Sequence, residues 1–124
     1  MTKGQTLNHD FTKGSLTLYD TNGNITYHED SDGSWEKREF DTNGNQTYYE
    51  SSNGYWHKRE YDTNGKLTYS ESSTGSWRKY EYDANGKETY RENSDGYWYK
   101  REYDTNGNEI YFESSRGLIR HSIW

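Results

Sequence analysis

The sequence predicts an all-β protein, an antiparallel meander of about twelve short strands that forms a single-layer twisted or curled sheet. Three observations predict it. A Tyr-Asp-x-Asn-Gly phrase, with Phe for Tyr once, recurs every 21 residues, and its aspartates are Asp20, Asp41, Asp62, Asp83 and Asp104. In each unit a second glycine follows the first after ten residues. The segments between glycines alternate aromatic or β-branched residues with polar ones and lack proline, which favours strands over helices.

We expect residues 1–22 to form an N-terminal cap repeat. Gly4 and Gly14 have the ten-residue spacing of the later units, but this copy is two residues short before Tyr19 and lacks a tryptophan. A terminal repeat has to cover a face that has no neighbour. The segment is therefore interpreted as a degenerate strand and turn.

Residues 23–106 are expected to form four regular hairpin repeats. Aspartate before Asn-Gly is a strong hairpin signal, because asparagine and glycine tolerate positive φ and the aspartate can bond to the turn backbone. Residues 107–124 are expected to form a C-terminal cap repeat, in which Ile119 takes the tryptophan position and Trp124 the tyrosine position. No linker divides the chain, so residues 1–124 are expected to be a single β-repeat domain.

Aromatic residues are expected to replace an aliphatic core. Hydrophobic residues make up 27% of the chain and aromatic residues 18%. Cross-strand aromatic and opposite-charge pairs contribute roughly 0.2 to 1 kcal/mol each. Strand alternation predicts that Trp56, Lys58 and Glu60 share one face. It also predicts that Gln46, Tyr48 and Glu50 share one side of their strand, opposite Thr47 and Tyr49.

A candidate binding surface follows from the recurring tryptophans. Exposed aromatic rows stack sugar rings or bind protein partners, and tryptophan, tyrosine and arginine dominate binding hot spots. The alternative is that the tryptophans cover the sheet or a dimer seam. The candidate residues are Trp35, Trp56, Trp77, Trp98, Tyr49, Lys58 and Glu60.

We expect no catalytic residue, no metal site, no cofactor and no enzymatic activity. The four histidines fall at unrelated repeat positions, and no nucleophile, base and orienting group occur together. The Asp-x-Asn-Gly-Asn phrase begins like a calcium loop, but Ser52 stands where the bidentate glutamate would follow Asp41.

The string KREYDTNG and its 21-residue period resemble the tyrosine-aspartate repeats of rearrangement-hotspot (RHS) and teneurin-type proteins. The matching positions are Tyr19-Asp20 with Gly23, Tyr61-Asp62 with Gly65, Tyr82-Asp83 with Gly86, and Tyr103-Asp104 with Gly107. The resemblance implies a β-repeat fold, which in that family spirals into a shell around a toxin or stands as an adhesive stalk. The chain is also similar to aromatic cell-wall-binding repeats.

The leading functional hypothesis is a non-enzymatic binding or structural module that presents aromatic and charged ladders to a protein partner. One alternative is a small acidic inhibitor from a phage or mobile element, a nucleic-acid mimic of the anti-CRISPR kind. Another is carbohydrate or cell-wall binding through the tryptophans. The net charge of −6 disfavours direct nucleic-acid binding. Without a signal peptide or apolar span, we expect a soluble cytoplasmic protein that does not bind membranes, with self-association through sheet faces or edges as a further hypothesis.

Overall fold

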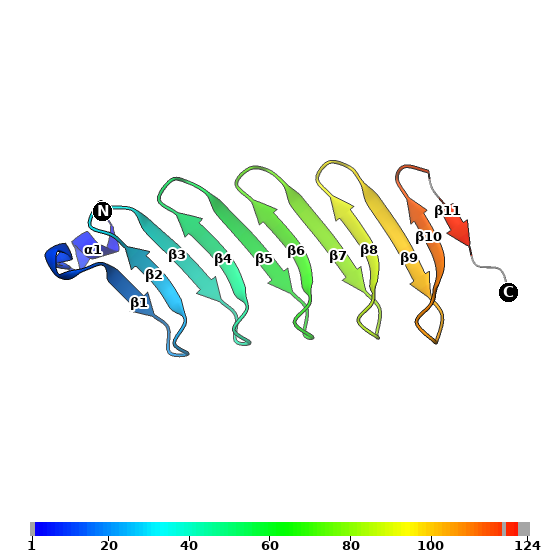
Figure 1. Ribbon diagram of the computed structural model, residues 1–124, viewed down its shortest axis with the longest axis horizontal. Helices are drawn as coiled ribbons and strands as arrows, with labels where there is room; N and C mark the ends of the chain where they lie inside the picture. The colour runs from blue at the N-terminus through cyan, green and yellow to red at the C-terminus, as the bar shows by residue number, and fades with distance from the viewer. Residues whose placement is uncertain (1, 118, 122–124) are drawn as a thin grey trace. The chain divides into compact units, whose positions relative to one another are not determined.

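The computed structural model describes residues 2–117 and 119–121. Over these residues, eleven strands follow one another in chain order as neighbours in one antiparallel sheet (Figure 1). The strands are β1 (Leu16–Tyr19), β2 (Ile25–Glu29), β3 (Trp35–Phe40), β4 (Gln46–Ser51), β5 (Trp56–Tyr61), β6 (Leu67–Ser72), β7 (Trp77–Tyr82), β8 (Glu88–Asn93), β9 (Trp98–Tyr103), β10 (Glu109–Ser114) and β11 (Ile119–His121). The predicted fold class, an all-β antiparallel meander in a single sheet, is confirmed.

The chain divides into two compact units. The first contains the residues up to Arg59 together with Ser72–Thr74, and the second contains Glu60–Glu71 together with the residues from Gly75 on. Both units are built from hairpins of the same 21-residue plan. Contacts that recur at one repeat position in both units are therefore properties of the repeat itself.

Each Tyr-Asp-x-Asn-Gly phrase forms a tight hairpin turn that its aspartate closes. The Asp41 N–H donates to the Asn45 carbonyl over 2.9 Å, and the Gly44 N–H donates to the Asp41 carbonyl over 3.1 Å. The Asp41 carboxylate accepts the N–H groups of Asn43 and Asn45, each over 2.9 Å. Gly44 has a φ of +86°. The turn thus uses a single left-handed residue, as in hairpins that combine a type I turn with a bulge.

A β-bulge beside this turn breaks the simple alternation of side chains. Glu39 pairs with Tyr48 and Phe40 pairs with Gln46, which leaves Thr47 as the extra residue. Glu88 occupies the Gln46 position two repeats later, and it contacts Arg91 and Tyr99 on the face opposite to the tryptophans. The expectation that Gln46 shares a face with Tyr48 is therefore wrong, because the bulge turns that position over.

The N-terminal segment differs from the expected strand and turn. It forms the short helix α1 (Lys3–Thr6) and the 3₁₀ helix η1 (Phe11–Lys13) before β1 begins. A capping box starts α1: the Thr2 hydroxyl accepts the Gln5 N–H over 3.2 Å, and the Gln5 side chain accepts the Thr2 N–H over 2.9 Å. The described residues accordingly hold eleven strands, where about twelve were expected.

The C-terminal cap follows the predicted alignment as far as the structure describes it. Ile119 pairs with Glu113, as Trp98 pairs with Glu92 in the preceding repeat. Ile119 therefore occupies the tryptophan position. The prediction for Trp124 lies outside the described residues.

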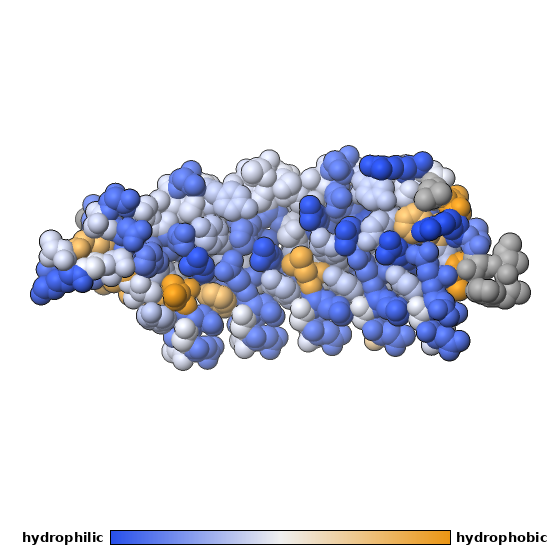
Figure 2. Space-filling view, viewed as in Figure 1, coloured by the Kyte–Doolittle hydropathy of each residue, from blue (hydrophilic) through white to orange (hydrophobic). Residues whose placement is uncertain are grey.

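Few side chains are buried, so cross-strand contacts hold each unit together. The buried aromatic residues are Tyr27, Tyr99 and Phe112, with exposed fractions of 4%, 7% and 6%. The visible surface in Figure 2 is accordingly mostly hydrophilic to neutral, with isolated hydrophobic residues. An additional main-chain hydrogen bond, which we call a joint, recurs at the second turn of the repeat. In the first example the Ser52 N–H donates to the Trp35 carbonyl over 2.9 Å. Equivalent bonds join Ser73 to Trp56, Ser94 to Trp77 and Ser115 to Trp98.

Candidate binding surface

One arrangement of four side chains recurs on the tryptophan-bearing face. A tyrosine and a glutamate two residues apart on one strand lie opposite a lysine and a tryptophan on the next strand. In β4 and β5, Tyr48 pairs with Lys58 and Glu50 pairs with Trp56. We call this arrangement a quartet. The quartets are Tyr27, Glu29, Trp35, Lys37; Tyr48, Glu50, Trp56, Lys58; Tyr69, Glu71, Trp77, Lys79; and Tyr90, Glu92, Trp98, Lys100.

Within a quartet the tyrosine donates to the glutamate of its own strand. The hydroxyl of Tyr48 donates to Glu50 over 2.8 Å, and that of Tyr90 donates to Glu92 over 2.8 Å. Burial, and then the hydrogen bond to Glu92, raise the pKa of Tyr90 to about 12. A tyrosine phenol is a protonated donor at neutral pH, and the glutamate that accepts its hydrogen bond keeps further acceptor positions.

In three of the quartets the lysine lies over the tryptophan of the same strand. The Nζ atoms of Lys58, Lys79 and Lys100 are 5.3, 5.1 and 5.4 Å from the ring centroids of Trp56, Trp77 and Trp98. These distances fit cation–π contacts. Each lysine is nevertheless exposed and each indole half-buried, so both groups remain accessible to a partner.

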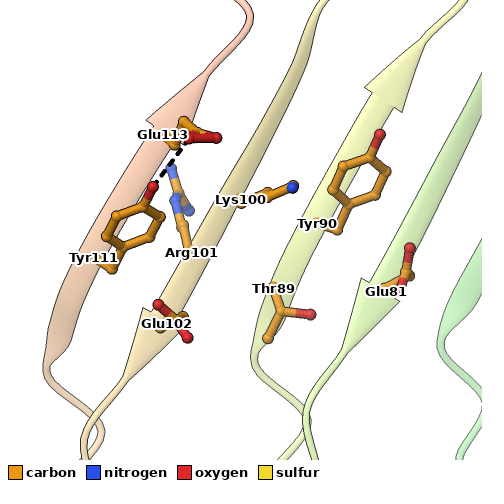
Figure 3. A pocket seen from close by; sticks show the side chains of 8 residues that line it. All are labelled: Glu81, Thr89, Tyr90, Lys100, Arg101, Glu102, Tyr111 and Glu113. Carbon is orange, nitrogen blue, oxygen red and sulfur yellow. Dashed lines mark hydrogen bonds between the residues drawn. The ribbon is translucent and has the colours of Figure 1, made fainter. Parts of the chain in front are cut away.

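A variant of the quartet ends the repeat series. Tyr111 donates to Glu113 over 3.0 Å, while His121 and Ile119 replace the lysine and the tryptophan. The Tyr111 and His121 ring centroids are 4.7 Å apart. A hollow of about 730 Å³ opens beside this variant, and Figure 3 shows Tyr111 and Glu113 on one side of it and Lys100 and Tyr90 toward the other.

The residues of the predicted surface lie on two different faces of the sheet. The four tryptophans each lie in a quartet, and Lys58 contacts Trp56 directly. Glu60 shares the tryptophan-bearing face, because the glutamates at its repeat position, Glu39 and Glu81, pair directly with the quartet tyrosines Tyr48 and Tyr90. Tyr49 lies on the opposite face, where its ring stacks on His57 at 5.3 Å and lies under Arg38. The predicted surface thus combines residues from two faces.

The opposite face uses its aromatic residues in stacks with arginine. Arg91 lies 5.0 Å from the ring centroid of Tyr80 and 5.5 Å from that of Tyr99. Arg101 lies 4.5 Å from Tyr99 and 5.4 Å from Phe112. These stacks bury Tyr99 and Phe112 within the second unit.

The predicted surface left out the glutamate of the quartet, although strand parity put Glu50 on the side of Tyr48. The signal was present as Tyr-x-Glu, which occurs five times at the same repeat position, at Glu29, Glu50, Glu71, Glu92 and Glu113. Residues two apart on a strand share a face, so a tyrosine hydroxyl can reach the carboxylate. The opposing lysine and tryptophan needed the strand register, which the sequence pattern alone does not provide.

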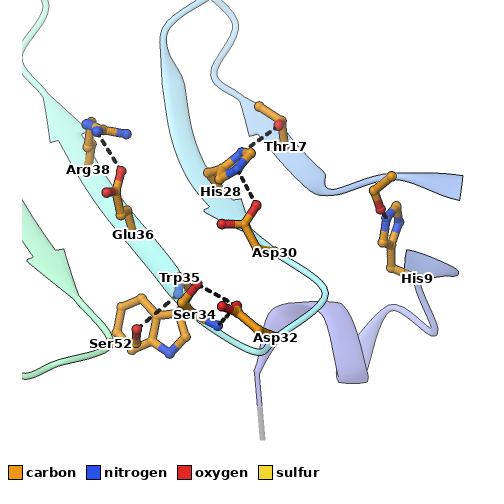
Figure 4. Close-up of polar contacts among 11 residues, drawn as sticks. His9, Thr17, His28, Asp30, Asp32, Ser34, Trp35, Glu36, Arg38 and Ser52 are labelled. Atoms are coloured by element: carbon orange, nitrogen blue, oxygen red, sulfur yellow. Dashed lines mark hydrogen bonds and ion pairs between the residues drawn. The ribbon is translucent and has the colours of Figure 1, made fainter. Parts of the chain in front are cut away.

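The histidine with the richest polar contacts is His28 on β2. Its Nδ1 lies 2.9 Å from the Thr17 hydroxyl and its Nε2 lies 3.1 Å from Asp30 (Figure 4). Thr17 and His28 are direct cross-strand partners. We therefore interpret the arrangement as a satisfied cross-strand contact. Among the described residues, no group of three histidine or acidic side chains could hold a metal ion.

The described segments include no helix with the length and apolarity that crossing a membrane requires.

The hairpin register and the quartets define an antiparallel β-repeat array, and the solved structures similar to this chain share that class of fold. No protein-family model and no curated protein matches the chain. It is similar to the crystal structure of TcdB2-TccC3-TEV, with a TM-score of 0.58 and 18% identity over 82% of this chain and 5% of that chain. A structure of the Photorhabdus luminescens Tc holotoxin pore gives a TM-score of 0.58 and 18% identity, over 82% of this chain and 5% of that chain.

The crystal structure of TcdB2-TccC3 gives a TM-score of 0.57 and 18% identity, over 82% of this chain and 6% of that chain. The chain thus spans only about one-twentieth of the length of the chains it matches. The similarity supports an RHS/YD-like β-repeat fold for this chain, and identity at this level carries the fold alone.

Proposed function

We propose that this chain is a β-repeat module that binds a protein partner through its quartets. The observation that carries the proposal is the constant register of tyrosine, glutamate, tryptophan and lysine in four hairpins, two in each compact unit. Tryptophan and tyrosine, two of the four side chains, are among the residues that dominate binding hot spots. The opposite face lacks this constancy, since its central strand position changes from Arg59 to Tyr80.

The charges of the quartet face favour a protein partner over the two alternatives. Lys58 and Glu60 alternate on one strand face, and this mixture does not present the continuous negative charge of a nucleic-acid mimic. Lys58 also lies over the Trp56 ring, so a stacked sugar would have to displace it. A protein surface with both charges matches the mixture directly.

A matched pair of variants on β5 tests the proposal. Lys58 and Arg59 are adjacent, exposed and positively charged, and strand alternation places them on opposite faces. Immobilised full chain would capture partners from the native host, and capture should fall at least about tenfold in Lys58→Ala and remain in Arg59→Ala. Equal capture by both variants would contradict the proposal. Quenching of tryptophan fluorescence by polysaccharide, with no protein captured, would favour the carbohydrate hypothesis instead.

A further inference from the structure

The first quartet is already occupied by a segment of the same chain. The Glu29 carboxylate accepts the Thr2 hydroxyl, the Gly4 N–H and the Tyr27 hydroxyl, each over 2.8 Å (Oε2 from Thr2, Oε1 from the other two). The Lys3 N–H donates to the Tyr27 hydroxyl over 3.3 Å, and the Lys3 Nζ lies 5.4 Å from the Tyr27 ring centroid. Three consecutive residues thus fill the site, and Glu29 is left 2% exposed.

Occupation coincides with a different position of the quartet lysine. Lys37 of the occupied quartet lies 5.9 Å from the Tyr48 ring centroid. The indole of Trp35 is stacked on Tyr27 at 6.1 Å with an interplanar angle of 22°. In the other three quartets the lysine lies over its own tryptophan. The lysine therefore has two positions, one beside an occupied site and one over the indole.

The occupied quartet also shows why glycine is required in its ligand. A Cβ atom on Gly4 would lie 2.8 Å from both Glu29 carboxylate oxygens and 2.5 Å from the Phe11 ring. Real Cβ atoms essentially never approach other atoms this closely, so the Glu29 carboxylate and the Phe11 ring would have to move out of their present contacts. A ligand of this shape must bring a hydroxyl, a basic side chain and a glycine N–H in succession.

We propose that the quartets at Glu50, Glu71 and Glu92 each bind a Ser/Thr-Lys-Gly segment of a partner protein. The inference rests on the proposed function and names the chemistry of the partner. Each of these quartets repeats the register of the occupied one. Each holds a half-buried glutamate to accept the hydroxyl and the glycine N–H, and a tyrosine ring over which the lysine of the segment can lie, as Lys3 lies over Tyr27. The chain's own segment is tethered beside the first quartet, where its effective concentration is high. The other three quartets are left for segments supplied by a partner.

A synthetic peptide with the sequence of residues 2–11, TKGQTLNHDF, tests this on the full chain. The chain is labelled with 5-fluorotryptophan, and the fluorine resonances are followed during titration. We expect the Trp56, Trp77 and Trp98 resonances to shift, with three peptides bound per chain, while Trp35 does not shift because its quartet is filled. The peptide with alanine in place of glycine should bind at least about tenfold more weakly.

A triple variant with a matched control tests whether the three quartet glutamates bind the peptide. Glu50→Gln with Glu71→Gln and Glu92→Gln should weaken peptide binding about tenfold or more at each site, because charge-assisted hydrogen bonds are lost. The control is Glu39→Gln with Glu81→Gln and Glu102→Gln, which makes the same charge change on the same face and should bind as the unmodified chain does. Circular dichroism verifies that both variants fold.

Three results would overturn the inference: no shift at millimolar peptide, equal binding of the alanine peptide, or equal weakening by the two triple variants. Dimerisation that removal of residues 2–6 abolishes would make a second copy the occupant and would overturn it as well. If the peptide fails while Lys58→Ala still abolishes partner capture, only this inference fails and the proposed function stands.

Discussion

The hydroxyl of Tyr82 donates a hydrogen bond to the main-chain carbonyl of Leu67 over 2.7 Å. The same ring lies beneath Lys66, whose Nζ is 5.6 Å from its centroid. Tyr103 repeats the arrangement with the carbonyl of Glu88, over 3.1 Å. The tyrosine of the Tyr-Asp phrase therefore attaches each of these hairpin ends to the neighbouring strand.

Tyr82→Phe removes that hydrogen bond and keeps the ring. We expect the free energy of unfolding to fall by about 1 kcal/mol, the usual net value of one such bond. Urea denaturation followed by circular dichroism measures the change. Tyr19→Phe is the control, since Tyr19 has the same repeat position and is 62% exposed. An equal loss in both variants would show that the Tyr82 hydroxyl contributes nothing specific.

Glu29→Gln should release the N-terminal segment from β2. The carboxylate accepts three donors, and a hydrogen bond to a charged acceptor contributes about 1.5 to 3 kcal/mol. We expect faster hydrogen exchange over residues 2–9 and little change elsewhere. Glu50→Gln is the matched control, because Glu50 accepts the equivalent tyrosine hydroxyl in the second quartet. Unchanged exchange at residues 2–9 in Glu29→Gln would contradict this role of the carboxylate.

Alkaline titration should reveal a group of resistant tyrosines. Burial, followed by hydrogen bonds to glutamate, raises the pKa values of Tyr27, Tyr90 and Tyr99 to about 12, from the ordinary value of 10.0. The unfolded chain loses these protons first, so the stability that they contribute is fully present below pH 10 and is lost as the pH rises toward 12. Ultraviolet difference absorbance should show a late phenolate transition. A single transition near pH 10, with the far-ultraviolet circular dichroism unchanged, would be the contrary result.

Gly65→Ala tests the left-handed turn position. Gly65 has a φ of +81°, and no atom lies within 4 Å of the position that a Cβ would take. The cost is therefore backbone strain of about 1 kcal/mol rather than a steric clash. Thermal unfolding should show a lower Tm for Gly65→Ala than for the control Thr63→Ala in the same turn. A Tm equal to that of the control would mean that this turn relaxes without strain.

The repeating part of the fold could be predicted because the residues of each turn are sufficient to specify that turn. The aspartate and glycine of the Asp41 turn satisfy the turn backbone without help from distant residues. The N-terminal helix could not be predicted in this way. Its capping box is local, but its main support is Glu29, which bonds to Gly4 across 25 positions of sequence. Tertiary contact there overrides the weak strand pattern.

The quartets could be predicted only in part from the sequence, for a related reason. Period and parity identified the tryptophans and Lys58, because these residues repeat on one strand face. Parity puts Tyr48 and Tyr49 on opposite faces, but only the strand register shows that Tyr48 is the one that shares the face of Lys58 and Trp56. The bulge at Thr47 likewise has no composition signal of its own, as threonine is an ordinary strand residue.

The joint between Ser52 and Trp35 uses main-chain atoms and one serine hydroxyl, and the three later serines repeat its main-chain bond. Such a joint does not depend on which aromatic or charged residues a given copy carries. Duplication or loss of one whole 21-residue cassette by unequal recombination would recreate the junction at the new boundary. Array length can thus change in single genetic steps, whereas an insertion whose length is not a multiple of 21 residues would put the following strands out of register.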